Sequence, residues 1–230
     1  MLGLHILAQL GESDCEIIHE GLLKQPVNAL SSLAFSVVGL LIALSASRAE
    51  GHERPIHLVF GLLLVLTGAG SLLFHGPQSS GSHFLHDATF LATLWFLAVM
   101  NLNEAYGWWT GRGWVAWLSG AVVLSVLLIV FPDSTNLLTV GMIVALVAGD
   151  IAIQRKGGII GAWYAVAVAT LAIAVGLMLA GRTGSPLCDP ESVVQAHGGW
   201  HVLMAIALGS YFMAMSNVRV AGRSQTPVKR

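Results

Sequence analysis

The chain has 230 residues, of which 55% are hydrophobic and only 10% are charged, and its mean hydropathy is +0.75. Soluble globular domains carry roughly 25% charged residues, so this composition excludes a soluble enzyme. The 11 Lys and Arg residues are balanced by 12 Asp and Glu residues, which leaves no basic surface for the phosphates of a nucleic acid. We therefore expect an all-α membrane protein that forms one helical bundle in the lipid bilayer.

Seven apolar runs that exclude Lys, Arg and Glu follow one another along the chain. A membrane-spanning helix needs about 20 apolar residues, so each run predicts one span: Asn28–Ser47, His57–His75, His83–Leu102, Trp114–Phe131, Thr135–Ile153, Ile159–Ala180 and Gln195–Met215. Every proline falls between these runs or just outside them, where its missing N–H is tolerated. The sequence thus predicts a seven-transmembrane domain over residues 28–215, preceded by a segment over 1–27 and followed by a tail over 216–230.

The distribution of basic residues predicts how the bundle is oriented. Seven spans place the termini on opposite sides, with Lys24 and Arg182 on the N-terminal side. The other nine basic residues fall on the opposite side: Arg48, Arg54, Arg112, Arg155, Lys156, Arg219, Arg223, Lys229 and Arg230. Because cytoplasmic loops carry the excess of Lys and Arg, we expect an N-terminus outside and a C-terminus in the cytoplasm.

Two further features bear on the segments outside the spans. The N-terminal 25 residues carry four acidic residues, Glu12, Asp14, Glu16 and Glu20, and no basic region leads into an apolar stretch. A cleaved signal peptide is therefore not expected. Four tryptophans gather around a turn on the cytoplasmic side, and we expect them to anchor the bundle at the membrane interface: Trp108, Trp109, Trp114 and Trp117.

The two cysteines both fall on the outer side of the predicted bundle. Cys15 precedes the first span, and Cys188 lies in the loop between the sixth and seventh spans. In an oxidising exterior they could form a disulfide. Two free thiols are the alternative.

Ionisable residues inside a bilayer are costly and by default indicate a functional site. The predicted spans contain His57, His75, His83, His86, Asp87, Asp150, His197 and His201. His57 and Asp150 lie near the cytoplasmic ends, beside Arg54 and Arg155, and we expect lipid headgroups to hydrate them. The other six residues fall at one depth, near the outer ends of three spans.

Helical spacing groups several of these residues on shared faces. Ser71 and His75 are at positions i and i+4 of the second span, and His197 and His201 have the same spacing on the seventh. Asp87 lies near the start of the third span. Three neutral imidazoles with one open position form the ligand set of a catalytic zinc site.

Alternative assignments remain open at this stage. His83 shares a helix face with Asp87 and could replace His75 as a ligand, and the histidines could hydrogen-bond between helices without a metal. Asn28 and Ser32 share a face on the first span and could line the pocket, although small polar residues in such helices often serve packing.

Several sequence segments resemble the alkaline ceramidase family, particularly its bacterial members. They are S-L-L-F-H at 71–75, H-D at 86–87 and C-D-P-E-S-V-V-Q-A-H-G-G-W-H at 188–201, and C-E at 15–16 with P-V-N-A-L-S-S-L-A-F at 26–35 resembles the start of that family's first span. The similarity runs from Cys15 to Tyr211. The Ser-x-x-x-His, Asp and His-x-x-x-His elements are shared by a wider superfamily of seven-transmembrane zinc lipid hydrolases and adiponectin-type receptors.

This resemblance implies a membrane amidase with zinc held by His75, His197 and His201. It also implies that Asp87 contacts the catalytic water and that Ser71 lies beside the metal. Such an enzyme would hydrolyse a lipid amide, with ceramide as the leading candidate, to a fatty acid and a sphingoid base. Asp87 would act as general base and then acid, and Ser71 would stabilise the oxyanion. Bacterial relatives suggest an inner membrane, with the active site in its extracytoplasmic half.

The resemblance gives little support to calcium binding. Some eukaryotic relatives bind calcium with acidic residues of the N-terminal segment and the first span. Glu16 matches that pattern, but Gln25 stands where a carboxylate is expected and Ile18 replaces a polar residue. Glu16 and His86 remain candidates for contact with the metal ligands.

A different class of function is compatible with the same residues. In a non-catalytic seven-helix lipid receptor, zinc would only tie the second, third and seventh spans together. The tail over 216–230 has only about 15 residues, too few for a signalling domain of ordinary size, which favours the enzyme. The sequence makes no prediction of the oligomeric state.

Overall fold

A computed structural model describes residues 13–106, 111–155 and 161–224, with side chains as far as Val218. The described chain is helical throughout, apart from turns and an isolated β-bridge between Asp14 and Arg182. Seven of its helical segments are long and apolar enough to cross a membrane, which confirms the predicted number. Several residues used in the sequence predictions lie outside the described residues: Glu12, Trp108, Trp109, Lys156, Ile159, Pro227, Lys229 and Arg230.

The first span consists of two helices, α1 (Pro26–Ser31) and α2 (Leu33–Ser45), followed by the short η1 (Ala46–Arg48). The remaining elements are α3 (Glu53–His75), α4 (Ser82–Tyr106), α5 (Arg112–Val130), η2 (Pro132–Ser134), α6 (Thr135–Gln154), α7 (Ala162–Ala180) and α8 (Ala196–Ser224). Three prolines begin elements or lie in a first turn, where no intrahelical partner for the N–H is needed: Pro26, Pro55 and Pro132. The last helix continues past the predicted end at Met215 to Ser224.

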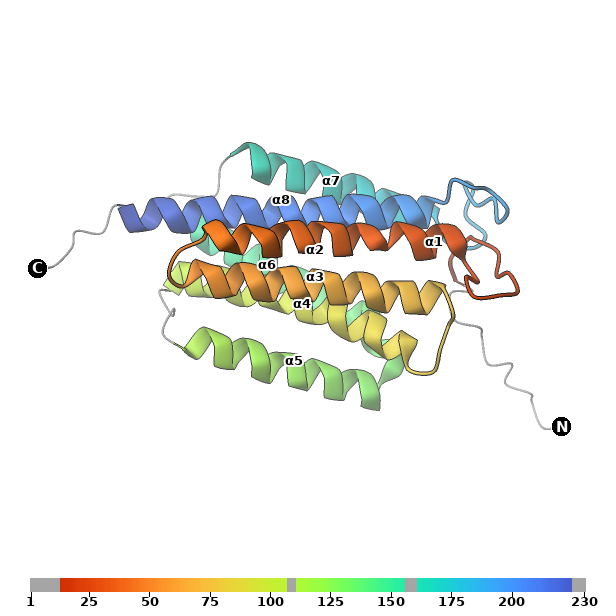
Figure 1. Ribbon diagram of the computed structural model, residues 1–230, viewed down its shortest axis with the longest axis horizontal. Helices are drawn as coiled ribbons and strands as arrows, with labels where there is room; N and C mark the ends of the chain where they lie inside the picture. Colours follow the sequence, from red (N-terminus) through yellow and green to blue (C-terminus); the bar gives the residue numbers. More distant parts are fainter. Residues whose placement is uncertain (1–12, 107–110, 156–160, 225–230) are drawn as a thin grey trace, which may run out of the picture.

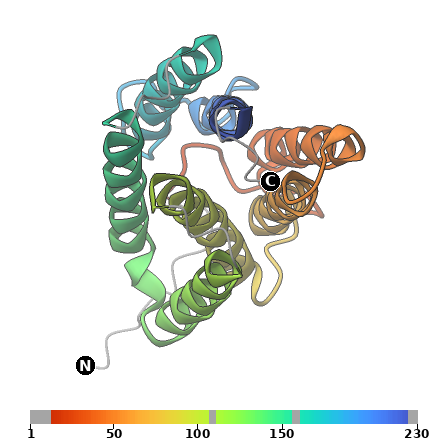
Figure 2. The ribbon, with the colours of Figure 1, turned by 90° about the vertical axis from the view of Figure 1, so that its left-hand side faces the viewer.

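The helices run along one common axis, and successive spans alternate in direction (Figure 1). We call the end where α3 finishes and α8 begins the histidine end, and the opposite end, where α3 begins and α6 finishes, the basic end. Viewed along the axis, α4 lies inside the bundle, between α3, α5 and α6 (Figure 2). The long α8 packs against α7 and against the two helices of the first span.

The buried side chains of the bundle come mostly from α3, α4 and α8. Phe60 of α3 stacks on Phe212 of α8 at a centroid distance of 4.5 Å and on Phe96 of α4 at 5.9 Å. By contrast, α5, α6 and α7 expose most of their apolar side chains, as expected of helices that face lipid. The histidines of interest therefore belong to the inner helices, away from the lipid-facing surface.

Helices α2 and α3 approach each other most closely at a reciprocal pair of glycines. A Cβ atom added to Gly39 would lie 2.5 Å from the carbonyl oxygen of Gly61, and one added to Gly61 would lie 2.6 Å from that of Gly39. Inside a bilayer the hydrophobic effect does not drive helices together. They associate in part through close packing at small residues such as these glycines. This contact fixes the first span against α3.

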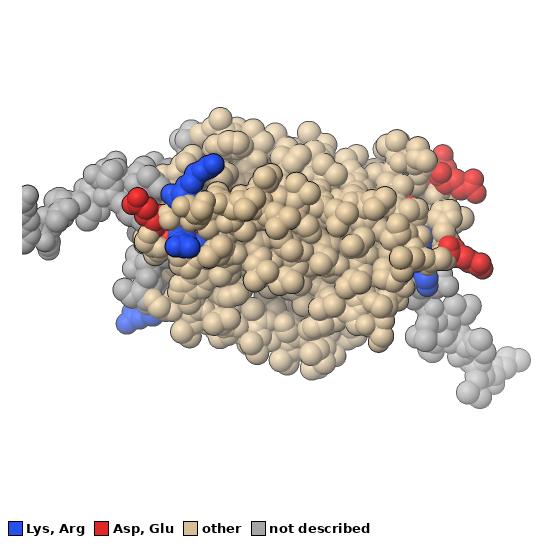
Figure 3. Space-filling model, viewed as in Figure 1, with Lys and Arg blue, Asp and Glu red and all other residues tan. Residues whose placement is uncertain are grey.

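On the face drawn in Figure 3, the charged side chains of the described residues lie at the ends of the molecule. Figure 3 shows Lys, Arg, Asp and Glu at the two ends of the long axis and a belt between them that is free of these residues on that face. Arg48, Arg54, Arg112 and Arg155 belong to segments at the basic end, whereas Lys24 and Arg182 belong to the histidine end. The distribution follows the pattern read from the sequence.

Two of the tryptophans predicted as interfacial anchors, Trp114 and Trp117, are half-buried against α4. Trp117 donates its Nε1–H to the carbonyl oxygen of Ala92, with the two atoms 3.3 Å apart, and its ring meets Phe96 edge-on at a centroid distance of 5.5 Å. Trp114 lies beside Trp117, with ring centroids 6.2 Å apart. Both side chains remain partly exposed, and their anchoring at the membrane interface stays a prediction.

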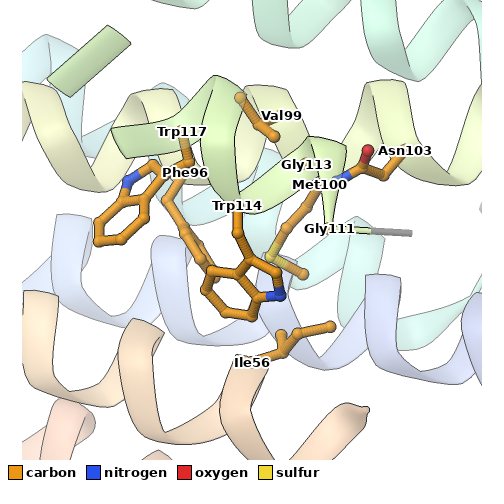
Figure 4. Close-up of a pocket in the computed structure, with 9 residues that line it drawn as sticks. All are labelled: Ile56, Phe96, Val99, Met100, Asn103, Gly111, Gly113, Trp114 and Trp117. Carbon is orange, nitrogen blue, oxygen red and sulfur yellow. The ribbon is translucent and has the colours of Figure 1, made fainter. Parts of the chain in front are cut away.

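These tryptophans line a small pocket at the basic end, with Ile56, Met100 and Asn103 among its other residues (Figure 4). Ile56 and His75 are both on α3, separated by 19 residues, or roughly 28 Å along the axis at 1.5 Å per residue. The pocket therefore lies near the opposite end of the bundle from the histidines.

Candidate metal centre

Three histidines meet at the histidine end. His75 closes α3, while His197 and His201 lie one turn apart at the start of α8. All three are buried, and one ring nitrogen from each lies within 4.8 Å of the others. Their ring centroids are 4.6 to 5.2 Å apart. The arrangement can hold a metal ion, and imidazole donors suit zinc, copper, iron and nickel.

Each of these imidazoles presents its Nδ1 atom to an oxygen from residues 14–31. The pairs are Gln25 with His75 at 2.8 Å, Ser31 with His201 at 3.0 Å, and Asp14 with His197 at 3.4 Å. An amide or carboxylate oxygen at Nδ1 can only accept, which favours the tautomer in which Nε2 carries the lone pair needed by a metal, and the Ser31 hydroxyl donates to the carbonyl oxygen of Asn28 and can therefore also accept. One stretch of chain before and within α1 thus orients all three side chains.

The histidine nitrogens themselves indicate an additional partner. Nε2 of His75 and both ring nitrogens of His197 are buried without a hydrogen-bond partner in the described structure. Buried polar atoms are nearly always hydrogen-bonded, and exceptions require an explanation such as an ion. A metal ion among the three rings would satisfy Nε2 of His75 and one ring nitrogen of His197, so the residues present fit the group that the sequence suggested.

Gln25 was not recognised from the sequence as part of this site. It occupies the N-cap position of α1, but its side chain does not cap the helix. Instead Oε1 faces His75, and Nε2 donates to the carbonyl oxygen of Glu16 at 2.9 Å. The sequence offered one signal. Pro26 marks the start of a helix, and glutamine is not among the usual N-cap residues at the position before it, which indicates another role for the Gln25 side chain.

Glu16 performs the capping that Gln25 does not. Its carboxylate accepts hydrogen bonds from the backbone N–H groups of Val27 at 2.7 Å and Asn28 at 2.8 Å. An anionic group is favoured at this position by the unpaired N–H groups and the dipole of the helix. Glu16 is therefore directed at the start of α1, and it reaches the histidines only through Gln25.

The first span contributes Ser31, and not Ser32, to the histidine site. Ser32 donates its hydroxyl to the carbonyl oxygen of Ala29 at 2.6 Å, within its own helix, as buried serines commonly do. The helix is interrupted at Ser32, so the i, i+4 face used in the sequence prediction does not continue through it. Asn28 is fully buried, and neither polar atom of its side chain has a hydrogen-bond partner in the described structure.

Ser71 lies within the histidine site. It is one helical turn before His75 and is almost fully buried. Its hydroxyl oxygen is 3.3 Å from Nε2 of His201. The spacing of Ser71 and His75 therefore brings a hydroxyl group and an imidazole to the same site.

Asp87 belongs to an adjoining hydrogen-bonded group on α4. Its Oδ1 is 2.7 Å from Nδ1 of His86, its Oδ2 is 3.2 Å from Nε2 of His83, and Oδ2 also accepts the hydroxyl of Thr135. The ring of His86 lies edge-on to His75 at a centroid distance of 6.0 Å. His83 thus binds Asp87 and does not take the place of His75, and His86 lies between Asp87 and the histidine cluster.

The segment before α1 is tied to the loop between α7 and α8. A disulfide joins Cys15 to Cys188, and the backbone N–H of Cys15 donates to Gly181 at 2.8 Å. Asp14, next to this disulfide, is 6% exposed. Burial raises the pKa of its carboxyl to about 6, while the positive charge of Arg182 acts to lower it.

The polar residues at the basic end have partners inside the protein. The carboxylate of Asp150 accepts hydrogen bonds from the Tyr211 hydroxyl, from Nδ2 of Asn101 at 2.9 Å and from the Tyr164 hydroxyl at 3.3 Å. These contacts join α6 to α8, α4 and α7. The prediction that headgroups hydrate Asp150 stays a prediction, and the structure adds a network between helices that the sequence did not show.

His57 also has internal contacts. Its Nδ1 lies 2.7 Å from the hydroxyl oxygen of Ser45, and its ring meets Phe212 edge-on at a centroid distance of 5.0 Å. The imidazole therefore connects α3 with α2 and α8, and its predicted contact with headgroups stays a prediction.

No protein-family model, curated protein or solved structure matches the chain. The resemblance to alkaline ceramidases consequently stays a prediction from the motifs at 15–16, 26–35, 71–75, 86–87 and 188–201. The metal centre rests on the geometry of the three histidines and their oxygen partners.

Proposed function

We propose that this chain is a zinc-dependent integral-membrane hydrolase that cleaves the amide bond of a lipid, with ceramide as the favoured substrate. The observation that carries the proposal is the cluster of His75, His197 and His201, buried at one end of a bundle of apolar helices. Three protein ligands leave the fourth position of a tetrahedral zinc ion open, as catalytic sites require. The products would be a fatty acid and a sphingoid base.

Hydrolysis of an amide requires a nucleophile and stabilisation of the charge that develops on the carbonyl oxygen. Zinc, when bound, polarises a carbonyl group and lowers the pKa of a water molecule toward about 7. Ser71, 3.3 Å from Nε2 of His201, donates a hydrogen bond to the substrate oxygen as its negative charge develops. A single donor of this kind contributes about 3 kcal/mol to the transition state.

Asp87 is the proposed general base. It accepts a proton from the attacking water and passes it to the leaving nitrogen, as a positioned carboxylate can. The contacts with His83, His86 and Thr135 hold the carboxylate near the histidine end. This role in proton transfer separates Asp87 from the three histidines, whose role is to bind the metal.

We infer an orientation in which the histidine end faces the extracytoplasmic side. Support comes from the basic residues, since Arg48, Arg54, Arg112 and Arg155 lie in segments at the basic end, which the positive-inside rule assigns to the cytoplasm. The disulfide at the histidine end is consistent with an oxidising compartment. A bacterial inner membrane, with the site in its outer half, is the proposed location.

A non-catalytic lipid receptor is the second candidate, and one observation favours it. Both carboxylate oxygens of Asp87 are already hydrogen-bonded to side chains of the protein. In a receptor, this group and the histidines would only tie α3, α4 and α8 together. The two candidates differ in whether the zinc-loaded protein turns over a lipid amide.

The test is to supply ceramide to the purified protein in lipid nanodiscs and to measure sphingoid-base release by mass spectrometry. We expect release by the zinc-loaded wild type, loss of release after chelation and recovery with zinc. His201→Ala should be inactive. His52→Ala, which removes an exposed histidine at the basic end, is the matched control and should retain activity. A folded, zinc-loaded wild type that hydrolyses no lipid amide would contradict the proposal and favour the receptor.

A further inference from the structure

We propose that Asp14 is a positioning residue of the metal centre, which orients His197 and adds a negative charge behind it. The inference rests on the metal centre of the proposed function and is independent of the lipid substrate. It assigns to the segment before α1 a role in metal affinity that its position outside the membrane spans does not suggest.

The three imidazoles differ in the charge of the oxygen that faces Nδ1. Two of them face neutral oxygens at Nδ1, from Gln25 and Ser31, at hydrogen-bond distance. His197 alone faces a carboxylate, with Nδ1 3.4 Å from Oδ1 of Asp14. At this distance the pair is within ion-pair range, although neither ring nitrogen of His197 has a hydrogen-bond partner in the described structure, and Asp14 lies where the other two histidines have neutral oxygens.

Backbone contacts hold residue 14 beside His197 independently of its side chain. Asp14 pairs with Arg182 in a β-bridge, its carbonyl oxygen accepts the hydroxyl of Thr183 at 3.2 Å, and the disulfide to Cys188 follows directly. The end of α7 abuts the start of α8, since a Cβ on Gly181 would lie 2.7 Å from the backbone nitrogen of His197. A substitution at residue 14 therefore acts mainly through loss of the carboxylate.

Asp14 can also supply negative charge to the metal centre. A site of three neutral imidazoles carries no charge to balance a divalent cation. A carboxylate that accepts the Nδ1–H of a metal-binding histidine fixes its tautomer and increases its basicity, and removal of such a partner typically lowers metal affinity 10- to 100-fold. Asp14 is the carboxylate that the structure places at a ligand's Nδ1, and Gln25 and Ser31 provide hydrogen bonding without charge.

The experiment is a double-mutant cycle on the full-length protein, with zinc affinity measured by competition against a chelator. We expect Asp14→Ala to weaken zinc binding about 10- to 100-fold. Asp14→Asn keeps the shape and the acceptor oxygen, so its loss should be smaller. In a His197→Ala background either substitution should change affinity less than about twofold, because a residue that acts through His197 has no effect once that side chain is absent.

Glu191→Gln is the matched control, since it neutralises an exposed carboxylate at the same end of the bundle and should leave zinc affinity unchanged. Helix content and the intact disulfide report folding, and Asp14→Asn alone completes the cycle if the alanine variant does not fold. Unchanged zinc affinity in both variants would overturn the inference, as would an equal loss with and without His197. A wild type that binds zinc but hydrolyses no lipid amide would overturn only the proposed function, whereas one that binds no zinc would overturn both.

Discussion

Gln25 and His75 are fifty positions apart in the sequence, and their side chains are joined by a 2.8 Å contact between Oε1 and Nδ1. An amide oxygen can only accept, so the imidazole donates its Nδ1–H and keeps the lone pair on Nε2. That Nε2 atom is buried without a hydrogen-bond partner in the described structure. The contact thus prepares His75 to bind a metal through Nε2.

Gln25→Ala should weaken zinc binding about 10- to 100-fold, because loss of the oxygen at Nδ1 frees both the tautomer and the orientation of His75. The measurement is a chelator competition on purified protein. Gln154→Ala, at the end of α6 and the opposite end of the bundle, is the control. An affinity equal to that of the wild type would show that Gln25 only packs against the histidine.

Asp87→Asn should abolish turnover of the lipid amide and leave zinc bound. The amide cannot accept the proton of the attacking water, and general base catalysis typically contributes 10²- to 10⁴-fold to the rate, so we expect a loss of at least about 100-fold. Zinc content and sphingoid-base release are measured on the same sample. Asp133→Asn, an exposed carboxylate in η2, is the control. Loss of zinc together with activity would assign Asp87 to metal binding instead.

Gly61→Ala should lower the melting temperature, because the new methyl group meets the backbone carbonyl of Gly39 at 2.6 Å and neither backbone can move independently of its helix. Overpacking of this kind costs about 1–3 kcal/mol. Thermal unfolding followed by circular dichroism is the measurement. Gly141→Ala on α6 places its methyl group in open space and should leave the melting temperature unchanged or raise it. Equal behaviour of the two variants would show that the glycine contact is not needed.

Tyr211→Phe should destabilise the basic end without affecting zinc content. It removes the hydroxyl that donates to Asp150 and that also receives a hydrogen bond from Asn101. Hydrogen bonds between membrane helices contribute about 0.6–1.7 kcal/mol, which sets the expected loss in the free energy of unfolding. Tyr106→Phe, with a mostly exposed ring, is the control. A loss of zinc in Tyr211→Phe would contradict the separation of the two ends.

The sequence was sufficient for the parts of the fold that depend on composition. Apolar runs of membrane-spanning length, interrupted by prolines and charges, predicted seven spans, and the structure confirms that number. Where the prediction depended on local context it was less accurate. The interruption at Ser32 shifts the histidine contact to Ser31, and a regular i, i+4 pattern cannot show such an interruption.

The histidine cluster was predicted from helical spacing within α3 and α8 and from the shared depth of these residues in their spans. Helical spacing was enough to associate Ser71 with His75 and His197 with His201. It could not show Gln25 or Asp14, because their contacts with His75 and His197 cross between segments far apart in the chain. The partners of Asp150 were missed for the same reason, since they come from three other helices.

The central claim is that His75, His197 and His201 bind a metal ion, and the most direct measurement is elemental analysis of the detergent-purified protein. Wild type, prepared without chelators, should be compared with the His197→Ala, His201→Ala double variant. The account predicts about one zinc per chain in the wild type, as a three-histidine site with an open fourth position would bind, and none in the double variant. A folded wild type without zinc, or equal zinc in both proteins, would contradict it and leave the histidines as a hydrogen-bonded cluster between helices.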